Sequence, residues 1–464
     1  MGTLRIPYFL YQSLGGLASV PVVATAAVLG RFGGRWGDRF GFPATHGEAP
    51  IWVHAASVGE AGSALALMAE LSKLAPKESF ALSVATPKGL EAASAALSGA
   101  QGSSKALAKA DTGGKPAAGA GPNPLASLSD RARVLAPPLD VWWAPGRFLA
   151  RMAPKALIIM ETELWPGIIF AAKDMGIPVM LAAGRVSKKS ARRYRMAGPV
   201  FTRLLQSLDL IAATGDEDRE NFLSLGADPK KTVTLGNPKF DRLIAIARDE
   251  PYVPASLGPP FVVTAGSTHP GEESLILRAV LKLRLANALS AKGKGPGIKL
   301  VLAPRHVGRA GSIVALAKRL GMAAETIGGD RRDLGREGLP EVGVLDVIGR
   351  LMDYYRLADL ALVGGSFVPG QGHNPLEPAA LGRAVVCGPN MSSFSEQARF
   401  LMDLSACKMV LPVNLYSVLA HFLDIPSVAL SKGLSGKLAV AGMTPAAPVL
   451  AERLLKVIRA TSPG

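Results

Sequence analysis

Residues 51–74 read IWVHAASVGEAGSALALMAELSKL, an apolar run followed by a loop of small residues and then by a stretch with helical spacing. Similar apolar runs recur further along the chain, at Phe80–Thr86, Phe261–Ala265, Leu300–Ala303 and Leu360–Val363. The first two of these precede stretches with helical spacing, one opened by Pro87 and one at Glu272–Arg284. Strands and helices that alternate in this way are typical of parallel sheets built from β-α-β units. The sequence therefore predicts an α/β protein.

A proline-rich stretch divides the pattern into two halves. Four prolines lie between Asp249 and Pro260, where they disfavour both helix and strand. Since 464 residues are enough for two or three domains, we expect two α/β domains at 32–248 and 261–464, joined by a linker at 249–260. Residues 99–128 are rich in Gly, Ala, Ser and Lys and lack aromatic residues. Such a segment cannot bury a core, so we expect a disordered insertion there.

The N-terminal stretch Ile6–Gly30 carries no charge. At 1.5 Å per residue it is long enough to cross a hydrocarbon core of about 30 Å. Arginines 31, 35 and 39 follow it, and the positive-inside rule places such a flank in the cytoplasm. A buried core helix and a cleaved signal peptide are the alternatives. Two glycines and a proline inside the stretch weaken a helix, which leaves both a full span and a shallow position in the membrane open. We expect residues 1–31 to be a membrane anchor.

The charge balance points to an anionic partner. Lys and Arg number 52 against 36 Asp and Glu, for a net charge of +16, which suits nucleic acid, an anionic membrane or a phosphorylated substrate. Six of the cations fall within residues 185–195, where Tyr194 is the single aromatic residue, so lipid phosphates fit this run better than nucleic acid does. Cys387 and Cys407 are the only cysteines, which excludes a disulfide scaffold and a Cys-x-x-Cys site.

Two acidic loops follow apolar runs in the first half of the chain. Glu60 lies just before the helix of the opening stretch, and Glu161 and Glu163 follow the run at 156–159. Open α/β sheets bind their ligands at the carboxyl ends of strands. Glu60 is therefore a candidate base, although a glutamate in the first turn of a helix also complements the helix dipole. A carboxylate at the end of a buried strand is costly unless it is paired or used.

Loops in the second half of the chain have phosphate-binding character. Glycine-rich segments at 266–269, 364–366 and 372–377 lead toward expected helices, whose N-terminal N–H groups can hold phosphate oxygens. Asn374 and Glu377 also fit a helix-capping set. Arg305 and Lys239 add cations, and together these groups describe an interdomain cleft with acid on one wall and phosphate-binding groups on the other. The acidic residues 216–218 are expected to start a solvated helix and to bind no metal, and the histidines show no metal-pair spacing.

Six motifs, in order along the chain, carry a specific resemblance. They are HAASVGE at 54–60, ETELWP at 161–166, GNPKFD at 236–241, AGSTH at 265–269, PRH at 304–306, and GGS at 364–366 with GHNPLEP at 372–378. The sequence resembles the 3-deoxy-D-manno-octulosonic acid (Kdo) transferases of lipopolysaccharide synthesis. The resemblance covers residues 1 to about 400.

The resemblance implies a GT-B fold with two Rossmann-like domains. It also implies inverting transfer of Kdo from CMP-Kdo to a lipid A precursor, lipid IVA, at the cytoplasmic face of the inner membrane, with no required metal or other cofactor. Glu60 would be the base, and Glu161 and Lys239 would support the transition state. The residues implied for CMP binding are Pro304, Arg305, Gly349, Arg350, Leu351, Asn374, Pro375, Leu376 and Glu377.

The chain departs from the family pattern at three positions. Arg350 stands where the family usually has Glu, Gly167 where Asn is frequent, and Pro238 where Leu is usual. The first departure leaves the role of Arg350 open. Two other readings also remain: another nucleotide-sugar transferase or epimerase of the same fold, and a nonenzymatic membrane-anchored binding module.

Overall fold

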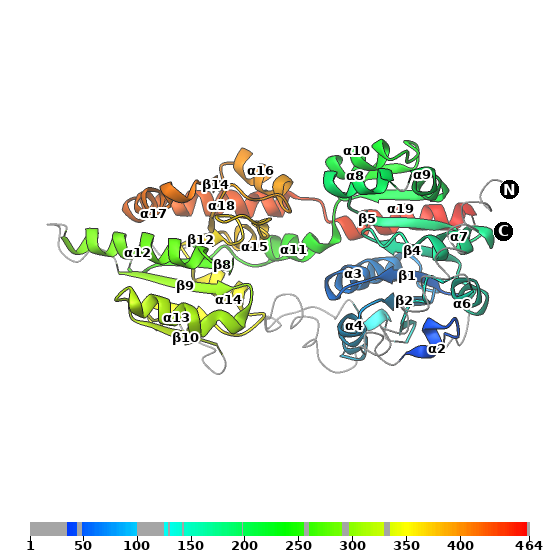
Figure 1. The fold of residues 1–464 in the computed structure, drawn as a ribbon, viewed down its shortest axis with the longest axis horizontal. Helices are drawn as coiled ribbons and strands as arrows, with labels where there is room; N and C mark the ends of the chain where they lie inside the picture. The colour runs from blue at the N-terminus through cyan, green and yellow to red at the C-terminus, as the bar shows by residue number, and fades with distance from the viewer. Residues whose placement is uncertain are drawn as a thin grey trace. The chain divides into compact units, whose positions relative to one another are not determined.

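The computed structural model describes residues 35–43, 49–99, 125–128, 130–141, 143–196, 198–254, 259–289, 297–328 and 335–461. The expected anchor at 1–31 lies outside these residues, and so does most of the expected insertion at 99–128. Its last residues are ordered, because Ala126–Leu128 forms a 3-10 turn and Leu128 is buried. The chain divides into two compact units (Figure 1). Unit 1 ends at Asp241 but also includes Pro445–Gly464, and unit 2 is essentially Arg242–Thr444.

Unit 1 contains a seven-stranded parallel sheet in the order β3-β2-β1-β4-β5-β6-β7. Its strands are β1 (Ile51–Ala55), β2 (Phe80–Val84), β3 (Ala132–Leu135), β4 (Ala156–Met160), β5 (Val179–Gly184), β6 (Leu210–Ala213) and β7 (Thr232–Thr234). The helices of this part of the chain are α2 (Trp36–Arg39), α3 (Val58–Leu74), α4 (Pro87–Gly99), α6 (Ala144–Met152), α7 (Pro166–Asp174), α8 (Lys188–Met196), α9 (Gly198–Ser207), α10 (Asp216–Ser224) and α19 (Ala446–Thr461).

Both faces of this sheet are buried, which explains why its strands are almost continuously apolar. Side chains of β1 alternate between the two faces: Ile51 and Val53 belong to the core cluster that includes residues of α3, α4 and α19, whereas Trp52 belongs to the cluster that includes residues of α6 and α7. The alternation follows from the two-residue period of a strand. The predicted parallel α/β architecture is confirmed for unit 1.

Unit 2 contains a second seven-stranded parallel sheet, in the order β10-β11-β9-β8-β12-β13-β14. Its strands are β8 (Phe261–Thr268), β9 (Ile298–Pro304), β10 (Ala324–Ile327), β11 (Val342–Leu345), β12 (Leu360–Val363), β13 (Ala384–Cys387) and β14 (Cys407–Met409). Its helices are α12 (Glu272–Leu289), α13 (Ala310–Arg319), α14 (Leu351–Leu357), α15 (Leu376–Ala380), α16 (Ser395–Asp403), α17 (Leu415–Asp424) and α18 (Pro426–Gly442), and α11 (Asp241–Asp249) begins at the boundary.

The C-terminal helix corrects the expected domain boundaries. Residues 261–464 were expected to form one domain, but α19 packs against α3 in unit 1. The cause is its apolar face, since Leu450 and Leu454 are completely buried in the core of unit 1. The chain also leaves unit 1 at Asp241, earlier than the expected linker at 249–260. The carboxylate of Asp241 accepts hydrogen bonds of 2.7 Å from the N–H groups of Ala446 and Ala447, so the residue that ends the first segment of unit 1 holds the start of α19.

Within the described residues, Pro426–Thr461 is long and apolar enough to be a candidate membrane span by length and composition. This segment comprises α18 and α19, which belong to different units. The apolar face of α19 is accounted for by its packing on α3.

Each sheet has one switch point, where the chain turns from building one side of the sheet to building the other. It lies between β1 and β4 in unit 1 and between β8 and β12 in unit 2. Open α/β sheets bind ligands at the carboxyl ends of the two strands that flank such a point. We therefore expect ligand-binding sites at these two switch points.

The assignment of α19 to unit 1 can be tested by Leu454→Ala. Loss of this buried leucine should lower the free energy of unfolding of unit 1 by about 2–5 kcal/mol. All five tryptophans precede Pro166 in the sequence, so urea unfolding followed by tryptophan fluorescence reports on unit 1. Leu438→Ala, at a position 63% exposed on α18, is the matched control and should leave the transition in place. An unchanged fluorescence transition in the Leu454 variant would contradict the assignment.

Candidate active site

The switch point of unit 1 brings together the three residues that the sequence singled out for catalysis. Glu60 lies in the first turn of α3, directly after β1, and Glu161 follows β4. Lys239 comes from the 3-10 turn η2 (Pro238–Phe240) and forms an ion pair with Glu161. A Cβ built on Gly59 would lie 3.9 Å from Cε of Lys239, so the lysine stem passes next to the start of α3.

Hydrogen bonds fix both carboxylate oxygens of Glu60. The N–H of Ala56 donates to Oε2 at 2.7 Å, and the hydroxyl of Ser57 donates to Oε1 at 3.0 Å. Ser57 is also the N-cap of α3. Glu60 therefore has the first-turn position that complements the helix dipole, and its hydrogen bonds hold a carboxylate that is only 9% exposed in one orientation at the switch point.

Strained backbone and a tight turn position the partners of Glu60. Glu161 has φ = 53°, a left-handed conformation that costs energy for a residue with a Cβ. Asn237 caps the turn η2 by accepting a 3.0 Å hydrogen bond from the N–H of Lys239. Pro238 occupies the first position of that turn, where its missing N–H is tolerated. The departure from the family's usual Leu is thus compatible with the local structure.

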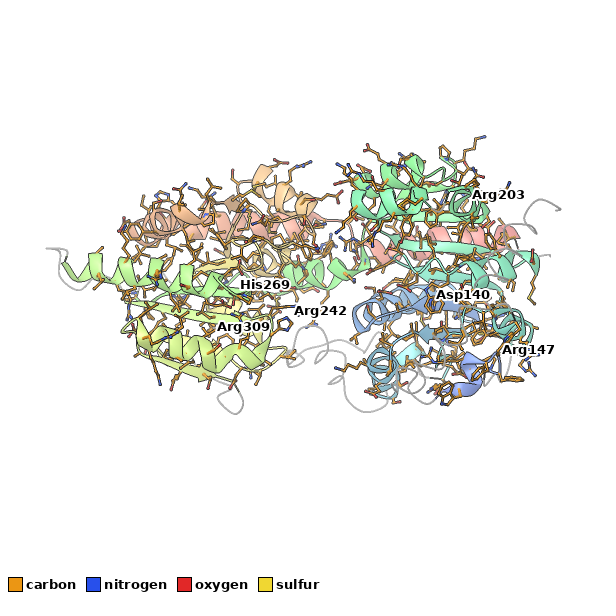
Figure 2. The ribbon with its side chains drawn as sticks, viewed as in Figure 1. Asp140, Arg147, Arg203, Arg242, His269 and Arg309 are labelled. Atoms are coloured by element: carbon orange, nitrogen blue, oxygen red, sulfur yellow. The ribbon has the colours of Figure 1, made fainter. Side chains whose placement is uncertain are left out.

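Gly167, the second departure, is explained by Asp140 (Figure 2). The Asp140 carboxylate accepts hydrogen bonds from the N–H groups of Gly167 at 3.1 Å and Ile168 at 2.9 Å, at the start of α7. A Cβ at position 167 would lie 2.3 Å from Oδ1 of Asp140. A side chain at position 167 would therefore push the Asp140 carboxylate out of its place at the start of α7.

A second acid, Glu163, lies in the same loop and was given no role by the sequence reasoning. Its Oε2 accepts a 2.8 Å hydrogen bond from Nε1 of Trp165. Burial raises the pKa of Glu163, the Trp165 hydrogen bond lowers it, and the charges of Glu60 and Glu161 raise it again. The three carboxyl groups are therefore close enough to influence one another's charge. The signal was in the sequence, where Glu163 shares a motif with Glu161.

His54 supports this loop from the core. Its Nδ1 lies 2.8 Å from the hydroxyl oxygen of Ser83, which also accepts a hydrogen bond from Nε1 of Trp52. The imidazole packs edge-on against Trp165, with 5.2 Å between ring centroids. Burial lowers the pKa of His54 to about 4, so the ring is neutral near pH 7. Because only 1% of His54 is exposed, it fixes the loop and has no surface with which to contact a substrate.

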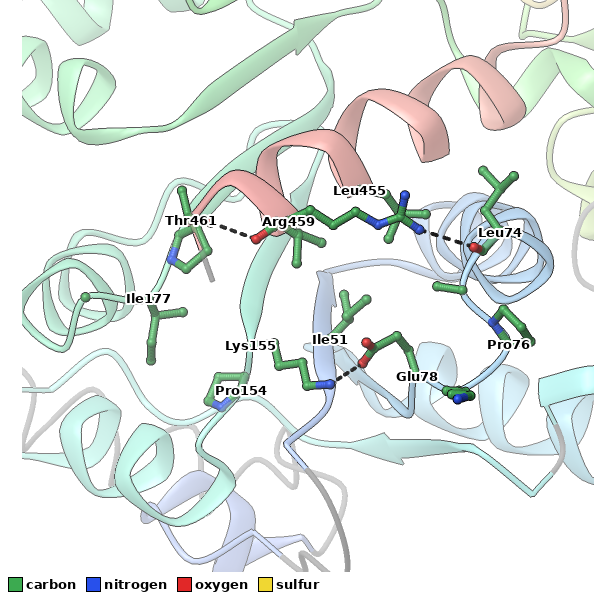
Figure 3. Close-up of a pocket in the computed structure, with 15 residues that line it drawn as sticks. Ile51, Leu74, Pro76, Glu78, Pro154, Lys155, Ile177, Leu455, Arg459 and Thr461 are labelled. Carbon is green, nitrogen blue, oxygen red and sulfur yellow. Dashed lines mark hydrogen bonds and ion pairs between the residues drawn. The ribbon is translucent and has the colours of Figure 1, made fainter. Parts of the chain in front are cut away.

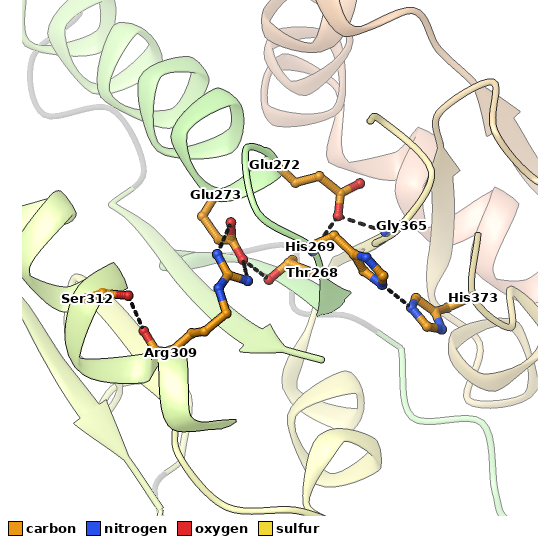
Figure 4. Close-up of polar contacts among 8 residues, drawn as sticks. All are labelled: Thr268, His269, Glu272, Glu273, Arg309, Ser312, Gly365 and His373. Carbon is orange, nitrogen blue, oxygen red and sulfur yellow. Dashed lines mark hydrogen bonds and ion pairs between the residues drawn. The ribbon is translucent and has the colours of Figure 1, made fainter. Parts of the chain in front are cut away.

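The switch point of unit 2 contains a pair of histidines (Figure 4). His269 follows β8, His373 lies in the loop after β12, and their Nε2 atoms are 2.9 Å apart. Burial, followed by the charges of His269 and Arg305, lowers the pKa of His373 to about 4. His373 is therefore neutral near pH 7, and Arg305 lies close enough to act on it.

The glycine-rich loop of unit 2 is occupied by a carboxylate of the chain itself. Fully buried Glu272 accepts hydrogen bonds of 2.7–3.0 Å from the N–H groups of Gly365, Ser366 and Phe367, and one of 2.8 Å from that of His269. Figure 4 shows the bonds from Gly365 and His269. The prediction that this loop holds phosphate oxygens is wrong for these three loop N–H groups, because Glu272 already satisfies them. The sequence placed Glu272 at a helix start but gave no sign that it turns back onto the loop.

The residues implied for nucleotide binding fall into two places in unit 2. Arg305 is exposed just after buried Pro304 at the end of β9, near His373. The second place includes Leu351, at the start of α14, and Glu377. A Cβ on Gly266 would lie 3.0 Å from Leu351 and closer still to Tyr355, and the charge of Glu377 contributes to raising the pKa of Tyr355.

The other residues implied for CMP binding are held by contacts within unit 2. Arg350 precedes α14 and pairs with Asp353, while Gly349 adopts φ = 89°. Asn374 accepts a 3.0 Å hydrogen bond from the N–H of Leu376, the first residue of α15, but Pro375 and not Asn374 directly precedes that helix, one residue later than the capping set weighed for it. Pro375 and Leu376 are buried.

The prediction of a solvated helix start at residues 216–218 is confirmed only in part. Asp216 does begin α10, but Asp218 is not solvated: it accepts hydrogen bonds from the N–H of Val186, at 2.8 Å, and from the hydroxyl of Thr214. Burial raises its pKa. Asp218 thus ties the loop before the basic helix α8 to α10.

A pocket of about 900 Å³ in unit 1 lies away from these groups (Figure 3). It is lined by residues at the amino ends of β1, β4 and β5 and by the end of α19, with a 2.7 Å ion pair between Lys155 and Glu78. Open α/β sheets bind their ligands at the carboxyl ends of the strands, and this pocket lies at the amino ends. We therefore do not assign it to the active site.

Comparison with known proteins agrees with this geometry. The family model of the 3-deoxy-D-manno-octulosonic-acid transferases matches residues 34–242. The 3-deoxy-D-manno-octulosonic acid transferase of Bordetella pertussis is 32% identical over 384 residues, covering 80% of either chain. That of Haemophilus influenzae is 30% identical over 400 residues, covering 83% of this chain and 81% of its own. In fold, the chain resembles a UDP-GlcNAc 2-epimerase of Neisseria meningitidis, with a TM-score of 0.50, 14% identity, and coverage of 88% of this chain and all of that one.

Two parallel α/β units, with acids and a lysine gathered at one switch point, define a two-domain α/β enzyme. The chain belongs to the 3-deoxy-D-manno-octulosonic acid transferase family, and it is a glycosyltransferase that transfers Kdo.

Burial of neutral His54 predicts how the stability of unit 1 depends on pH. Between about pH 6.5 and 4 the unfolded chain binds a proton at His54 that the folded chain does not, so the free energy of unfolding falls as pH falls. Going from pH 7 to pH 5 should cost the wild type about 2 kcal/mol more than His54→Gln. Urea unfolding followed by tryptophan fluorescence at both pH values measures this, with His421→Gln on α17 as the exposed control. Equal pH dependence in the wild type and the His54 variant would refute the prediction.

Proposed function

We propose that the protein catalyses inverting transfer of Kdo from CMP-Kdo to a lipid A precursor, lipid IVA. The two units would be the two domains of a GT-B glycosyltransferase. The observation that carries the proposal is the buried Glu60 carboxylate, fixed by Ala56 and Ser57 next to the Lys239–Glu161 ion pair. The identity of the transferred sugar, Kdo, is inferred from the family to which the chain belongs.

Glu60 acts as the general base in this proposal. Displacement of a nucleotide phosphate from a sugar passes through an oxocarbenium-like state, and inversion needs one base on the face opposite the leaving group. Ala56 and Ser57 hold the carboxylate of Glu60 in place, so little reorganisation is needed when it takes the proton of the acceptor hydroxyl. Preorganised groups of this kind act where charge develops in the transition state.

Lys239 and Arg305 complement anionic substrates. The leaving CMP and the carboxylate of Kdo are both negative, and a fixed cation lowers the cost of the charge that develops on the departing phosphate. Lys239 is oriented by Glu161 and Asn237. Arg305 is exposed and close to His373, so it can meet a phosphate without first breaking an ion pair seen among the described residues. We assign CMP to Arg305 and to the surrounding residues of unit 2 named above.

The setting is the cytoplasmic face of the inner membrane, where lipopolysaccharide synthesis would use the product. Residues 1–31 would be the single anchor. The basic helix α8 supports this setting, because Lys188, Lys189, Arg192 and Arg195 are exposed on it and suit anionic lipid headgroups.

Replacing the base without changing its shape tests the proposed function. Glu60→Gln should lower the rate of Kdo transfer by about 10²- to 10⁴-fold, the usual contribution of a general base. Its affinity for CMP should stay within a few-fold of wild type, because Glu60 belongs to unit 1 and the proposed CMP residues to unit 2. The assay follows labelled Kdo from CMP-Kdo into lipid IVA, and calorimetry measures CMP binding.

Arg305→Ala is the contrasting variant. It should weaken CMP binding by about 1.5–3 kcal/mol, the range for a hydrogen bond to a charged group. Near-normal turnover by Glu60→Gln would show that the base lies elsewhere, and an unchanged CMP titration of Arg305→Ala would place the nucleotide elsewhere.

A further inference from the structure

Arg39, the last residue of α2, is a buried cation that the proposed mechanism does not use. It is only 4% exposed, although the sequence counted it among the arginines that flank the expected anchor. Its Nη2 group donates a 2.9 Å hydrogen bond to the carbonyl of Ala85, which directly follows β2. Since a buried guanidinium is costly unless its N–H groups are hydrogen-bonded, this contact ties the cation to the end of β2.

Backbone and aromatic contacts hold α2 itself in place. The carbonyl of Arg39 accepts a 2.9 Å hydrogen bond from the N–H of Leu139. Phe40, the residue after α2, stacks on Trp143 with 5.7 Å between ring centroids, and Trp143 directly precedes α6. The guanidinium of Arg39 therefore reaches the end of β2 from a fixed support within unit 1.

From Ala85 a short series of backbone hydrogen bonds leads to Glu60. The N–H of Ala85 donates to the carbonyl of Ala55 at 3.0 Å, and the N–H of Thr86 donates to the carbonyl of Ala56 at 3.1 Å. The N–H of Ala56 is the group that donates to Oε2 of Glu60 at 2.7 Å. The end of β2, which the cation of α2 holds, thus holds in turn the backbone that orients the carboxylate.

We propose that Arg39 is a positioning residue for Kdo transfer. By fixing the end of β2, it keeps the N–H of Ala56 aimed at Glu60 and the Glu60 carboxylate in the orientation that accepts the proton of the acceptor hydroxyl. This inference rests on the proposed role of Glu60 as the base. A misplacement of about 1 Å at a reacting group can cost about 100-fold in rate. Because Arg39 is buried, it acts through the loop backbone and does not touch the substrate.

Arg39→Met tests the inference, since methionine keeps an apolar stem but has no donor for the Ala85 carbonyl. We expect kcat for transfer from CMP-Kdo to detergent-dispersed lipid IVA to fall about 10- to 100-fold. KM for CMP-Kdo should stay close to the wild-type value, because the proposed CMP residues lie in unit 2. Arg39→Lys keeps a charge and a donor but has a shorter reach, so its kcat should lie between those of Arg39→Met and the wild type.

Arg35→Met is the matched control from the same end of unit 1. Arg35 directly precedes α2, and its guanidinium donates a 2.7 Å hydrogen bond to the carbonyl of Val134 in β3. This variant loses an arginine and a hydrogen bond to a backbone carbonyl, but it keeps the contact to the end of β2. It should keep the wild-type kcat, with folding of each variant checked by tryptophan fluorescence.

Amide hydrogen exchange, followed by mass spectrometry, gives a readout that does not depend on the base. In Arg39→Met and Arg39→Lys, peptides covering residues 54–60 and 84–90 should exchange faster than in the wild type, because local opening becomes easier there. Peptides from α10 should exchange as in the wild type. Wild-type kcat or wild-type exchange of residues 54–60 in both folded variants would overturn the inference.

A double variant separates this inference from the proposed function. Glu60→Gln/Arg39→Met should transfer Kdo no more slowly than Glu60→Gln alone, because no base is left to position. A further loss in the double variant as large as that of Arg39→Met alone would show that Arg39 acts by another route, which would overturn the inference. If Glu60→Gln is impaired while Arg39→Met is normal, this inference alone fails. If Glu60→Gln keeps its activity, the proposed base itself fails.

Discussion

The ion pair between Lys239 and Glu161 is the interaction on which the site of unit 1 depends. The switch point gathers Glu60, Glu161 and Glu163, and three neighbouring carboxylates without a cation would repel one another. The cation arrives from a distant part of the sequence. It reaches the site because the sheet extends to β7 and the turn η2 follows, and because the carboxylate of Asp241, just after η2, holds the start of α19. The long-range fold of unit 1 thus brings Lys239 into contact with Glu161.

The switch point of unit 2 is arranged differently from that of unit 1. There the glycine-rich loop is satisfied internally by buried Glu272, and the groups left to meet an anion are side chains, above all Arg305 near the neutral His373. The Glu272 carboxylate holds this loop through the N–H groups of Gly365, Ser366 and Phe367. Under the proposed function, unit 1 handles the acceptor proton and unit 2 the nucleotide.

Much of this could be predicted from the sequence, because parallel strands are continuous apolar runs and their carboxyl ends are marked by small and acidic residues. The two sheets and the placing of Glu60 and Glu161 at the ends of strands are examples. Lys239 was grouped with these acids only by the family resemblance, because its own sequence context placed it with the phosphate-binding cations, and the structure pairs it with Glu161. What could not be predicted depends on packing between distant segments. The apolar pattern of α19 does not indicate which unit the helix packs against. In the same way, the sequence around Glu272 does not distinguish a glutamate that faces solvent from one that folds back on a loop. The role of His54 could not be predicted either, because its neighbours in the sequence do not show that it is buried and supports the loop after β4.

Under the proposed function, Kdo transfer takes place at Glu60, Glu161 and Lys239 of unit 1. The most direct test is the single-turnover rate of Lys239→Met with saturating CMP-Kdo and lipid IVA, since methionine keeps the stem of the lysine but removes its charge. We expect a loss of at least about 100-fold, comparable to the loss of one electrostatic contact to a transition state, with CMP binding by unit 2 unchanged in calorimetry. Transfer at close to the wild-type rate by the folded variant would contradict it.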